Sequence, residues 1–443
     1  MLTGSMRRRG FLFAAATTLM LGLAGCAAPV AAPAGEAAAP SGEERVFRIW
    51  HYEAADSAMS IAWDDAIADF QVMHPDVKIE FERKTFEQMV ETSKMVLSSN
   101  DVPDLMEINK GNATAGLYAR EGLLTNLDEV AKERGWDTLL APSIQTTARY
   151  NEQGIMGTGS LFGIPTYGEY VMVYYNKDIF AANGLEVPTT LEEFEAVADA
   201  LVAAGIQPLA LGASSRWPQS HNWQEMLLYK ADRELISNFQ FLTGDVDFEG
   251  EAFNYAATKF AEQVQKGYFG ENANGIIYDD ANASFVQGDV AMNLTGSWAF
   301  GGFSTQITDF DWGIFLMPGK QFTTGSGGNN WVVPANAQNK DLAYDLINLT
   351  LQPKSQTVMA NAGGIPINAD LEQITDPMIK ELNAKFAEIV AADGLAYYPD
   401  WPVPGYMDVL AAGLQEIIAG SMTPAEFNAT LAAPYEDYKS TLQ

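Results

Sequence analysis

Cysteine and histidine are scarce in this sequence of 443 residues, which holds one Cys and three His. The histidines, His51, His74 and His221, are scattered and form no His-x-x-x-His or His-Glu-x-x-His spacing of a zinc site. No regular ladder of Asp and Asn with a closing Glu indicates a calcium loop. We therefore expect no metal and no cofactor. Since Cys26 is the lone thiol, no disulfide braces the chain.

Basic residues are also few, because 26 Lys and Arg stand against 57 Asp and Glu, for a net charge of −31. Such a charge repels the phosphates of nucleic acids, so we exclude nucleic acid as a partner. The same charge favours a cationic ligand.

Motifs for catalysis are missing as well. No Gly-x-Ser-x-Gly elbow occurs, and the Gly-rich residues 324–334 lack the Lys of a phosphate loop.

Long apolar runs are confined to the N-terminus. Three arginines precede an apolar run over residues 11–23, and small residues follow, which is the order of a bacterial secretion signal. Leu-Ala-Gly-Cys at its end resembles a lipoprotein signal, in which the Cys is acylated. We predict a signal peptide over residues 1–25, lipidation of Cys26 and a disordered Ala/Pro-rich tether over residues 26–44. Export by the general or by the twin-arginine route stays open.

The rest of the chain alternates short β-rich runs with amphipathic helical patterns. Strands are predicted over residues 46–52, 77–83 and 102–108, with helices over 57–75 and 86–97 between them. This alternation implies right-handed crossovers and a parallel sheet, hence an α/β fold. It restarts later. Further strands are expected at 170–180, 208–212, 290–296, 311–318 and from 331, and helices at 191–205, up to 351, at 406–420 and from 423.

In open parallel sheets, ligands bind beyond the carboxyl ends of the strands, so we expect the binding residues there. Trp298 stands on a tight turn directly after the predicted strand 290–296. Aromatic faces pack against the C–H surface of sugar rings, and neighbouring carboxylates and amides bond hydroxyl groups. Ordinary core packing is the alternative for the tryptophans, and a packing or capping role is expected for His221. The candidates of this kind are Tyr52, Glu53, Asp56, Phe86, Asn109, Lys110, Asn112, Trp217, Trp223, Trp298, Asn329 and Trp401.

Several stretches, in order from about residue 46 onward, resemble the extracellular solute-binding proteins of sugar ABC importers, the family that includes maltose-binding protein. They are FRIWHY, HPDVKIEFE, DVPDLMEI with LYAREGLL, GIPTYGEYVMVYYNKDIF, FVQGDVAMNLTGSWAF, DWGIFLMPG and NNWVVPANAQNKDLAYDLINL. The resemblance implies a type II periplasmic-binding-protein fold, in which two α/β lobes are joined by a hinge that the chain crosses more than once. It implies binding without catalysis.

The resemblance also implies a division of the chain. Lobe I comprises residues 45–168 and 316–366, and lobe II comprises residues 169–315 and 367–443. The crossings are expected near residues 167–170, near 313–318 and after 363–368. Glu169 falls where the family places a carboxylate before the YNKD strand, and Trp298 falls where the Gly-x-Trp tryptophan stacks on a sugar. Tyr167, Asp400 and Tyr406 complete the candidates, although YYPDWPVPGY is richer in proline than the maltose-type pattern.

We expect a monomeric, lipid-anchored receptor on the extracytoplasmic face of a bacterial membrane. It binds a sugar or oligosaccharide between its lobes and delivers it to the permease subunits of an ABC importer. Two alternatives stay open. The same fold could bind a polyamine or another cationic or polar nutrient, which the acidic balance allows. A secreted glycoside hydrolase would instead use a carboxylate pair from among Glu53, Asp56, Glu169 and Asp400.

Overall fold

The structure is a computed structural model that describes residues 45–442. The predicted signal peptide, the lipidation of Cys26 and the predicted tether fall on residues 1–44 and lie outside the described residues. Residues 45–442 belong to one compact unit. None of their helices combines the length and the apolar character that a bilayer crossing requires.

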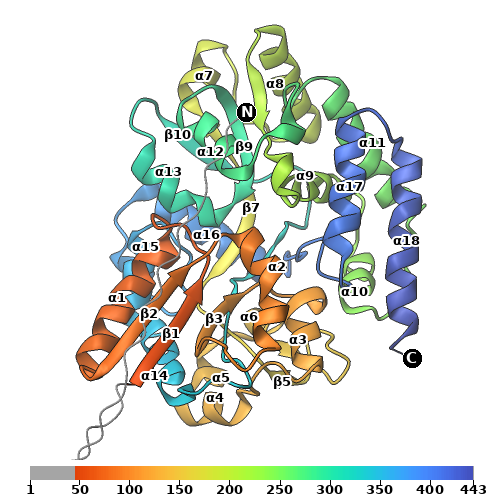
Figure 1. Cartoon of the computed structure of the whole chain (residues 1–443). Coiled ribbons are helices and arrows are strands. Elements are labelled where there is room, and N and C mark those ends of the chain that lie inside the picture. The colour runs from red at the N-terminus through yellow and green to blue at the C-terminus, as the bar shows by residue number, and fades with distance from the viewer. Residues whose placement is uncertain (1–44, 443) are drawn as a thin grey trace, which may run out of the picture. The chain divides into compact units, whose positions relative to one another are not determined.

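The first sheet has the strand order β2-β1-β3-β12-β6. Figure 1 shows β2, β1 and β3 of this sheet side by side. Its strands are β1 (Arg45–His51), β2 (Val77–Arg83), β3 (Leu105–Ile108), β6 (Ile164–Pro165) and β12 (Asn330–Val332). Strand β1 pairs in parallel with β2 and β3, as the alternation of strands and helices predicts. Strand β12 returns from far along the chain and pairs antiparallel with β3 and β6, so the sheet is mixed rather than all parallel.

Local capping fixes where the helices beside this sheet begin. Helix α1 (Ala58–Met73) follows Ser57, whose side chain accepts a hydrogen bond from the Ser60 N–H, and α2 (Phe86–Leu97) opens with a capping box. Helix α1 packs against α14 (Lys340–Thr350) and α15 (Pro353–Asn361) (Figure 1). Shorter elements follow β3: α3 (Leu117–Arg120), α4 (Asp128–Arg134), α5 (Trp136–Leu139), α6 (Pro142–Gln145), and the paired β4 (Arg149–Tyr150) and β5 (Ser160–Leu161).

The second sheet has the order β10-β7-β9-β8, and β11 pairs with β7. Its strands are β7 (Gly168–Asn176), β8 (Gln207–Ala210), β9 (Val290–Gly296), β10 (Trp312–Phe315) and β11 (Gly325–Gly327). Only β8 and β9 run parallel, because β7 is antiparallel to β9, β10 and β11. The strand predicted over residues 170–180 ends early. The Asn176 side chain accepts a hydrogen bond from the Ile179 N–H and starts helix α7 (Lys177–Ala182).

Nine further α-helices within residues 45–442 lie in the part of the chain that forms the second sheet and in the C-terminal region. Thr190 caps α8 and Thr423 caps α18, and both predictions are confirmed. The C-terminal helices α17 and α18 pack together and against α11, as Figure 1 shows. The helices are α8 (Leu191–Ala203), α9 (Pro218–Leu227), α10 (Arg233–Phe241), α11 (Glu251–Gln265), α12 (Tyr278–Val286), α13 (Phe300–Gln306), α16 (Pro377–Ala391), α17 (Tyr406–Ile418) and α18 (Pro424–Ser440).

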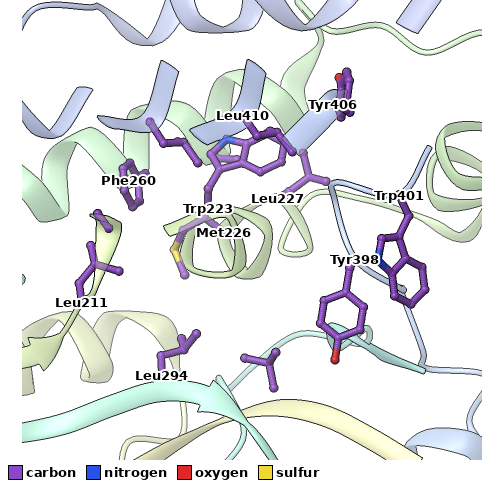
Figure 2. Close-up of a cluster of buried hydrophobic side chains, with 14 of the residues drawn as sticks. Leu211, Trp223, Met226, Leu227, Phe260, Leu294, Tyr398, Trp401, Tyr406 and Leu410 are labelled. Carbon is purple, nitrogen blue, oxygen red and sulfur yellow. The ribbon is translucent and has the colours of Figure 1, made fainter. Parts of the chain in front are cut away.

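Two predicted binding residues, Trp223 and Tyr406, lie in the hydrophobic core formed by these helices (Figure 2). Neither side chain is exposed at all. The Trp223 ring lies 5.8 Å from those of Phe253 and Phe427, and the Tyr406 hydroxyl donates to the Leu431 carbonyl oxygen at 3.2 Å. Their assignment to the ligand is therefore corrected. Trp223 is two helical positions beyond His221, which turns it toward the opposite side of α9.

Three chain segments run side by side between the two sheets. The chain leaves the first sheet after β6 and enters the second with β7, close to the predicted crossing at residues 167–170. Strand β11 still pairs with β7 of the second sheet, and β12 pairs with β3 of the first, so the chain returns between β11 and β12. This crossing comes later in the chain than the one predicted at residues 313–318. The Gly168 N–H donates to the Ile365 carbonyl oxygen at 2.8 Å, which ties in the third segment. Gly328 is needed there, because a Cβ would meet the Tyr167 ring at 2.5 Å.

Candidate functional site

A cavity of about 780 Å³ is lined by residues that follow strands of both sheets. One wall comes from the loops after β1 and β3 and from the start of α2, and the other comes from β7, α9, α12, α13 and the loop before α17. Most of the predicted site residues meet here, as the rule for strand ends predicts. They are Tyr52, Glu53, Asp56, Phe86, Asn109, Glu169, Trp217, Trp298, Asn329, Asp400 and Trp401.

An aromatic wall, formed by Trp217, His221, Tyr278, Trp298 and Tyr398, faces this cavity. The Trp298 ring is half-buried, and its centroid lies 5.9 Å from that of Trp217, 6.0 Å from His221 and 6.3 Å from Tyr398. The Trp298 indole N–H donates to the Tyr278 hydroxyl oxygen at 2.8 Å. The wall therefore presents a held indole face of the kind that packs on apolar C–H surface.

The Gly-x-Trp spacing has a local cause. Strand β9 ends at Gly296, and Trp298 stands in the short turn after it. A Cβ placed on Gly296 would meet the Trp298 ring at 2.0 Å. Glycine therefore lets the indole lie back across the strand end, where it can both touch the strand and line the cavity.

Glu169, at the start of β7, lines the cavity from a buried position, with 3% of its surface exposed. Its Oε1 accepts from the Lys110 ammonium at 2.7 Å and from the Ser326 hydroxyl at 3.3 Å. Lys110 also donates to Asn329 Oδ1 at 2.8 Å. Burial lowers the pKa of Lys110, and the charge of Glu169 opposes that shift. Lys110 does not line the cavity, but its ammonium holds Glu169 and Asn329, which do. Its prediction as a ligand-binding residue is therefore corrected.

Tyr167 and Asn112 are two further corrections, since neither lines the cavity. The Tyr167 hydroxyl donates to Glu53 Oε1 at 3.1 Å. The Asn112 amide donates to the carbonyl oxygens of Gln240 at 2.8 Å and Pro402 at 3.0 Å. Both side chains therefore bond to other residues of the protein. Tyr167 positions Glu53, which lines the cavity, and Asn112 joins the segments of Gln240 and Pro402.

Glu53 forms a close carboxyl pair with Glu107, a strand residue that the sequence does not single out. Burial, followed by the charge of Glu53, raises the pKa of Glu107 well above its usual range. Burial also raises the pKa of Glu53. Two buried carboxyls that act on each other in this way disfavour the state in which both are ionised.

His221 lines the cavity, although the sequence predicts a packing or capping role for it. It lies on the wall beside Trp217, four residues earlier, with ring centroids 5.0 Å apart. Burial lowers the pKa of His221 to about 3, so its imidazole is neutral. Three buried polar atoms of the wall have no hydrogen-bond partner within residues 45–442: His221 Nδ1, Trp217 Nε1 and the Tyr398 hydroxyl. Buried polar groups normally have partners, so these atoms are candidates for hydrogen bonds to a bound molecule or to water.

The cavity also has residues at its mouth that the sequence does not reveal. Asp279 and Tyr278 stand in the first turn of α12, after a loop with no strand before it. Within the described chain, no group of three or more His, Cys, Asp or Glu is arranged to hold a metal ion.

Known proteins resemble this chain in sequence over most of its length. Residues 56–357 match the family model described as bacterial extracellular solute-binding protein. The chain belongs to this family. It is 25% identical over 391 residues to the diacetylchitobiose binding protein of Streptomyces coelicolor, across 83% of this chain and 86% of that protein. It is also 25% identical over 440 residues to the galactooligosaccharide-binding protein of Bacillus subtilis, across 95% of both.

Solved structures show the same fold for this solute-binding protein. A chitin oligosaccharide binding protein superposes with a TM-score of 0.74 at 21% identity, covering 89% of this chain and 100% of that one. The expected two-lobe α/β fold is thereby confirmed.

Proposed function

We propose that this solute-binding protein binds a sugar or oligosaccharide in the cavity and delivers it to the permease subunits of an ABC importer. The observation that carries this proposal is that Trp298, from the end of β9, and Glu169, from the start of β7, line one cavity. An indole face for the ring and a carboxylate with nearby amides for the hydroxyls suit a saccharide. The two relatives named above, a diacetylchitobiose binding protein and a galactooligosaccharide-binding protein, support it.

A ligand bound between two walls can change the conformation of the protein, and a permease can recognise that change. Residues from the first sheet (Tyr52, Glu53) and from the second (Trp217, Trp298) line the same cavity. A ligand that touches both walls stabilises the arrangement in which they are close, and this shifts an equilibrium that already exists. We propose that the permease recognises that closed form, that no catalytic step takes place, and that a lipid on Cys26 holds the monomer at the extracytoplasmic face.

A thermal-shift panel tests the ligand class. Mono- and oligosaccharides are expected to raise the unfolding temperature, because a ligand that binds only the folded state adds about 2.7 kcal/mol of stability at 100 times its dissociation constant. Polyamines such as spermidine serve as the comparison. A shift with spermidine and none with any saccharide would replace the proposal with the polyamine alternative. Release of reducing ends from an oligosaccharide would instead support the hydrolase.

Replacing Trp298 by Ala is expected to cost about 1–3 kcal/mol of binding free energy, because the ring contact with the ligand is lost. Calorimetric titration of a saccharide hit measures the effect. Trp50→Ala is the matched control, since Trp50 is also half-buried but does not line the cavity. Unchanged affinity in Trp298→Ala, with the fold intact by circular dichroism, would contradict the assigned site.

A further inference from the structure

We propose that the saccharide carries at least one positively charged ammonium group, as an amino sugar with a free amine does, and that Asp400 binds this group. The inference rests on the proposed function, which places a saccharide in the cavity. It goes beyond that function because it names the charge of the ligand and the residue that recognises it.

The lining of the cavity has an excess of negative charge. Six carboxylates line it: Glu53, Asp56, Glu87, Glu169, Asp279 and Asp400. Among the described residues only Glu169 of these forms an ion pair, with Lys110. Two cationic side chains, Arg83 and Lys84, also line the cavity, but Lys84 pairs with Glu82 at 2.6 Å. A neutral ligand that displaced water would leave these carboxylates without a counter-charge.

Like charges act on one another from the two sides of the mouth. Asp56 follows β1 and Glu87 stands in the first turn of α2, whereas Asp279 stands in the first turn of α12. Burial, and then the charges of Glu87, Asp280 and Asp56, raise the pKa of Asp279. Closure of the cavity around a neutral ligand would bring these carboxylates closer together. A cation between them would turn this repulsion into attraction.

Asp400 and Glu53 are the most buried of the unpaired carboxylates, and Asp400 is the one that no second carboxyl accompanies. It is 8% exposed, lines the cavity, and makes no ion pair and no side-chain hydrogen bond with another described residue. The Lys110 ammonium bonds Glu169 and Asn329 instead, and its charge offsets the effect of burial on the pKa of Asp400 only in part. Burial raises the pKa of Asp400 to about 7. A ligand ammonium would supply the missing counter-charge.

A second, independent group beside Asp400 fits an ammonium. The Tyr398 hydroxyl is buried, lines the cavity and has no hydrogen-bond partner within residues 45–442. Burial raises the pKa of Tyr398 most, then Glu169 through its charge and through a hydrogen bond, and then the charge of Asp400, which stands two residues further along the chain. An ammonium has three donors and no acceptor, which matches a carboxylate and a hydroxyl oxygen.

The test uses saccharides that differ only in charge. The β-1,4-linked disaccharides of glucosamine, of N-acetylglucosamine and of glucose are titrated calorimetrically into the full chain, with the matching galactose-series monosaccharides and spermidine as further arms. The free amine is expected to bind about tenfold or more tightly than both neutral counterparts. The difference should shrink at about 0.5 M salt, because salt screens charge.

Two variants identify the residue. Asp400→Asn is expected to remove the preference for the free amine, lowering its affinity about tenfold or more while the neutral analogues change little. Asp280→Asn removes the same charge from a residue that does not line the cavity, and it should keep the preference.

Each outcome bears on the inference. Neutral saccharides that bind as tightly as the free amine would overturn it and leave the proposed function standing. Binding of spermidine, with no binding of any saccharide, would overturn both. An amine preference that survives in Asp400→Asn would overturn the role of Asp400.

Discussion

Replacing Lys110 by Met is expected to lower the free energy of unfolding by about 3–5 kcal/mol, the usual loss when one partner of a buried ion pair is removed. The side chains of Lys110 and Glu169 are 1% and 4% exposed, and their charged atoms are 2.7 Å apart. Without the ammonium, the Glu169 carboxylate stays buried near Glu53 and has no counter-charge. The pair also joins the loop after β3 of the first sheet to β7 of the second, so its loss acts on both.

Denaturant unfolding of the full chain measures this loss, and Lys94→Met is the matched control. Lys94 pairs with Glu121 at 2.8 Å, but its side chain is 51% exposed. Exposed pairs contribute about 0–1 kcal/mol. Adding Glu169→Gln to Lys110→Met should recover part of the stability, because the uncompensated charge is gone. Similar losses of unfolding free energy in Lys110→Met and Lys94→Met would show that burial does not make the Lys110–Glu169 pair more stabilising than an exposed pair.

Replacing Asp400 by Asn is expected to stabilise the ligand-free protein at pH 8. Folding raises the pKa of Asp400 from 3.8 to about 7, so the folded state holds this proton more tightly than the unfolded state. The stability of the wild type therefore falls as pH rises through this window, and the cost is complete above pH 7. Since one pKa unit corresponds to about 1.4 kcal/mol, the full cost is on the order of 4 kcal/mol. Asn keeps the shape and removes the charge.

Unfolding of both proteins at several pH values tests this. The difference in stability should be largest at pH 8 and should shrink towards zero below about pH 3, where Asp400 is protonated in both the folded and the unfolded state. Asp280→Asn, at an exposed position, is expected to show no such pH-dependent difference. A less stable Asp400→Asn protein at pH 8 would mean that another group already neutralises the carboxylate. The expected combination of gained stability and lost binding is typical of residues kept for function.

Local patterns in the sequence predict the strand ends, and with them much of the site. Periodicity locates β1 and β9, and the residues just beyond them, Tyr52, Glu53 and Trp298, line the cavity. The same reasoning cannot separate Trp217 from Trp223. Both stand among Pro, His and Asn, but Trp217 lies at the N-cap of α9 and lines the cavity, whereas Trp223 lies within α9 on the side that faces the core.

Contacts between distant parts of the chain account for what the sequence leaves undetermined. Strand β12 inserts beside β3, and this makes the first sheet mixed. Glu107 looks like an ordinary strand residue, and only the folded chain brings Glu53 beside it. Tyr278 and Tyr398 reach the cavity from segments that no predicted strand precedes. Their role depends on tertiary packing, which composition and spacing do not encode.

A crystal structure of the full chain with a saccharide hit from the thermal-shift panel tests the central claim most directly. We predict ligand density in the cavity, with a sugar ring stacked on the Trp298 indole and polar groups of the ligand bonded to Glu169 and Asp400. A saccharide bound elsewhere on the molecule, with the Trp298 face left uncovered, would contradict the account.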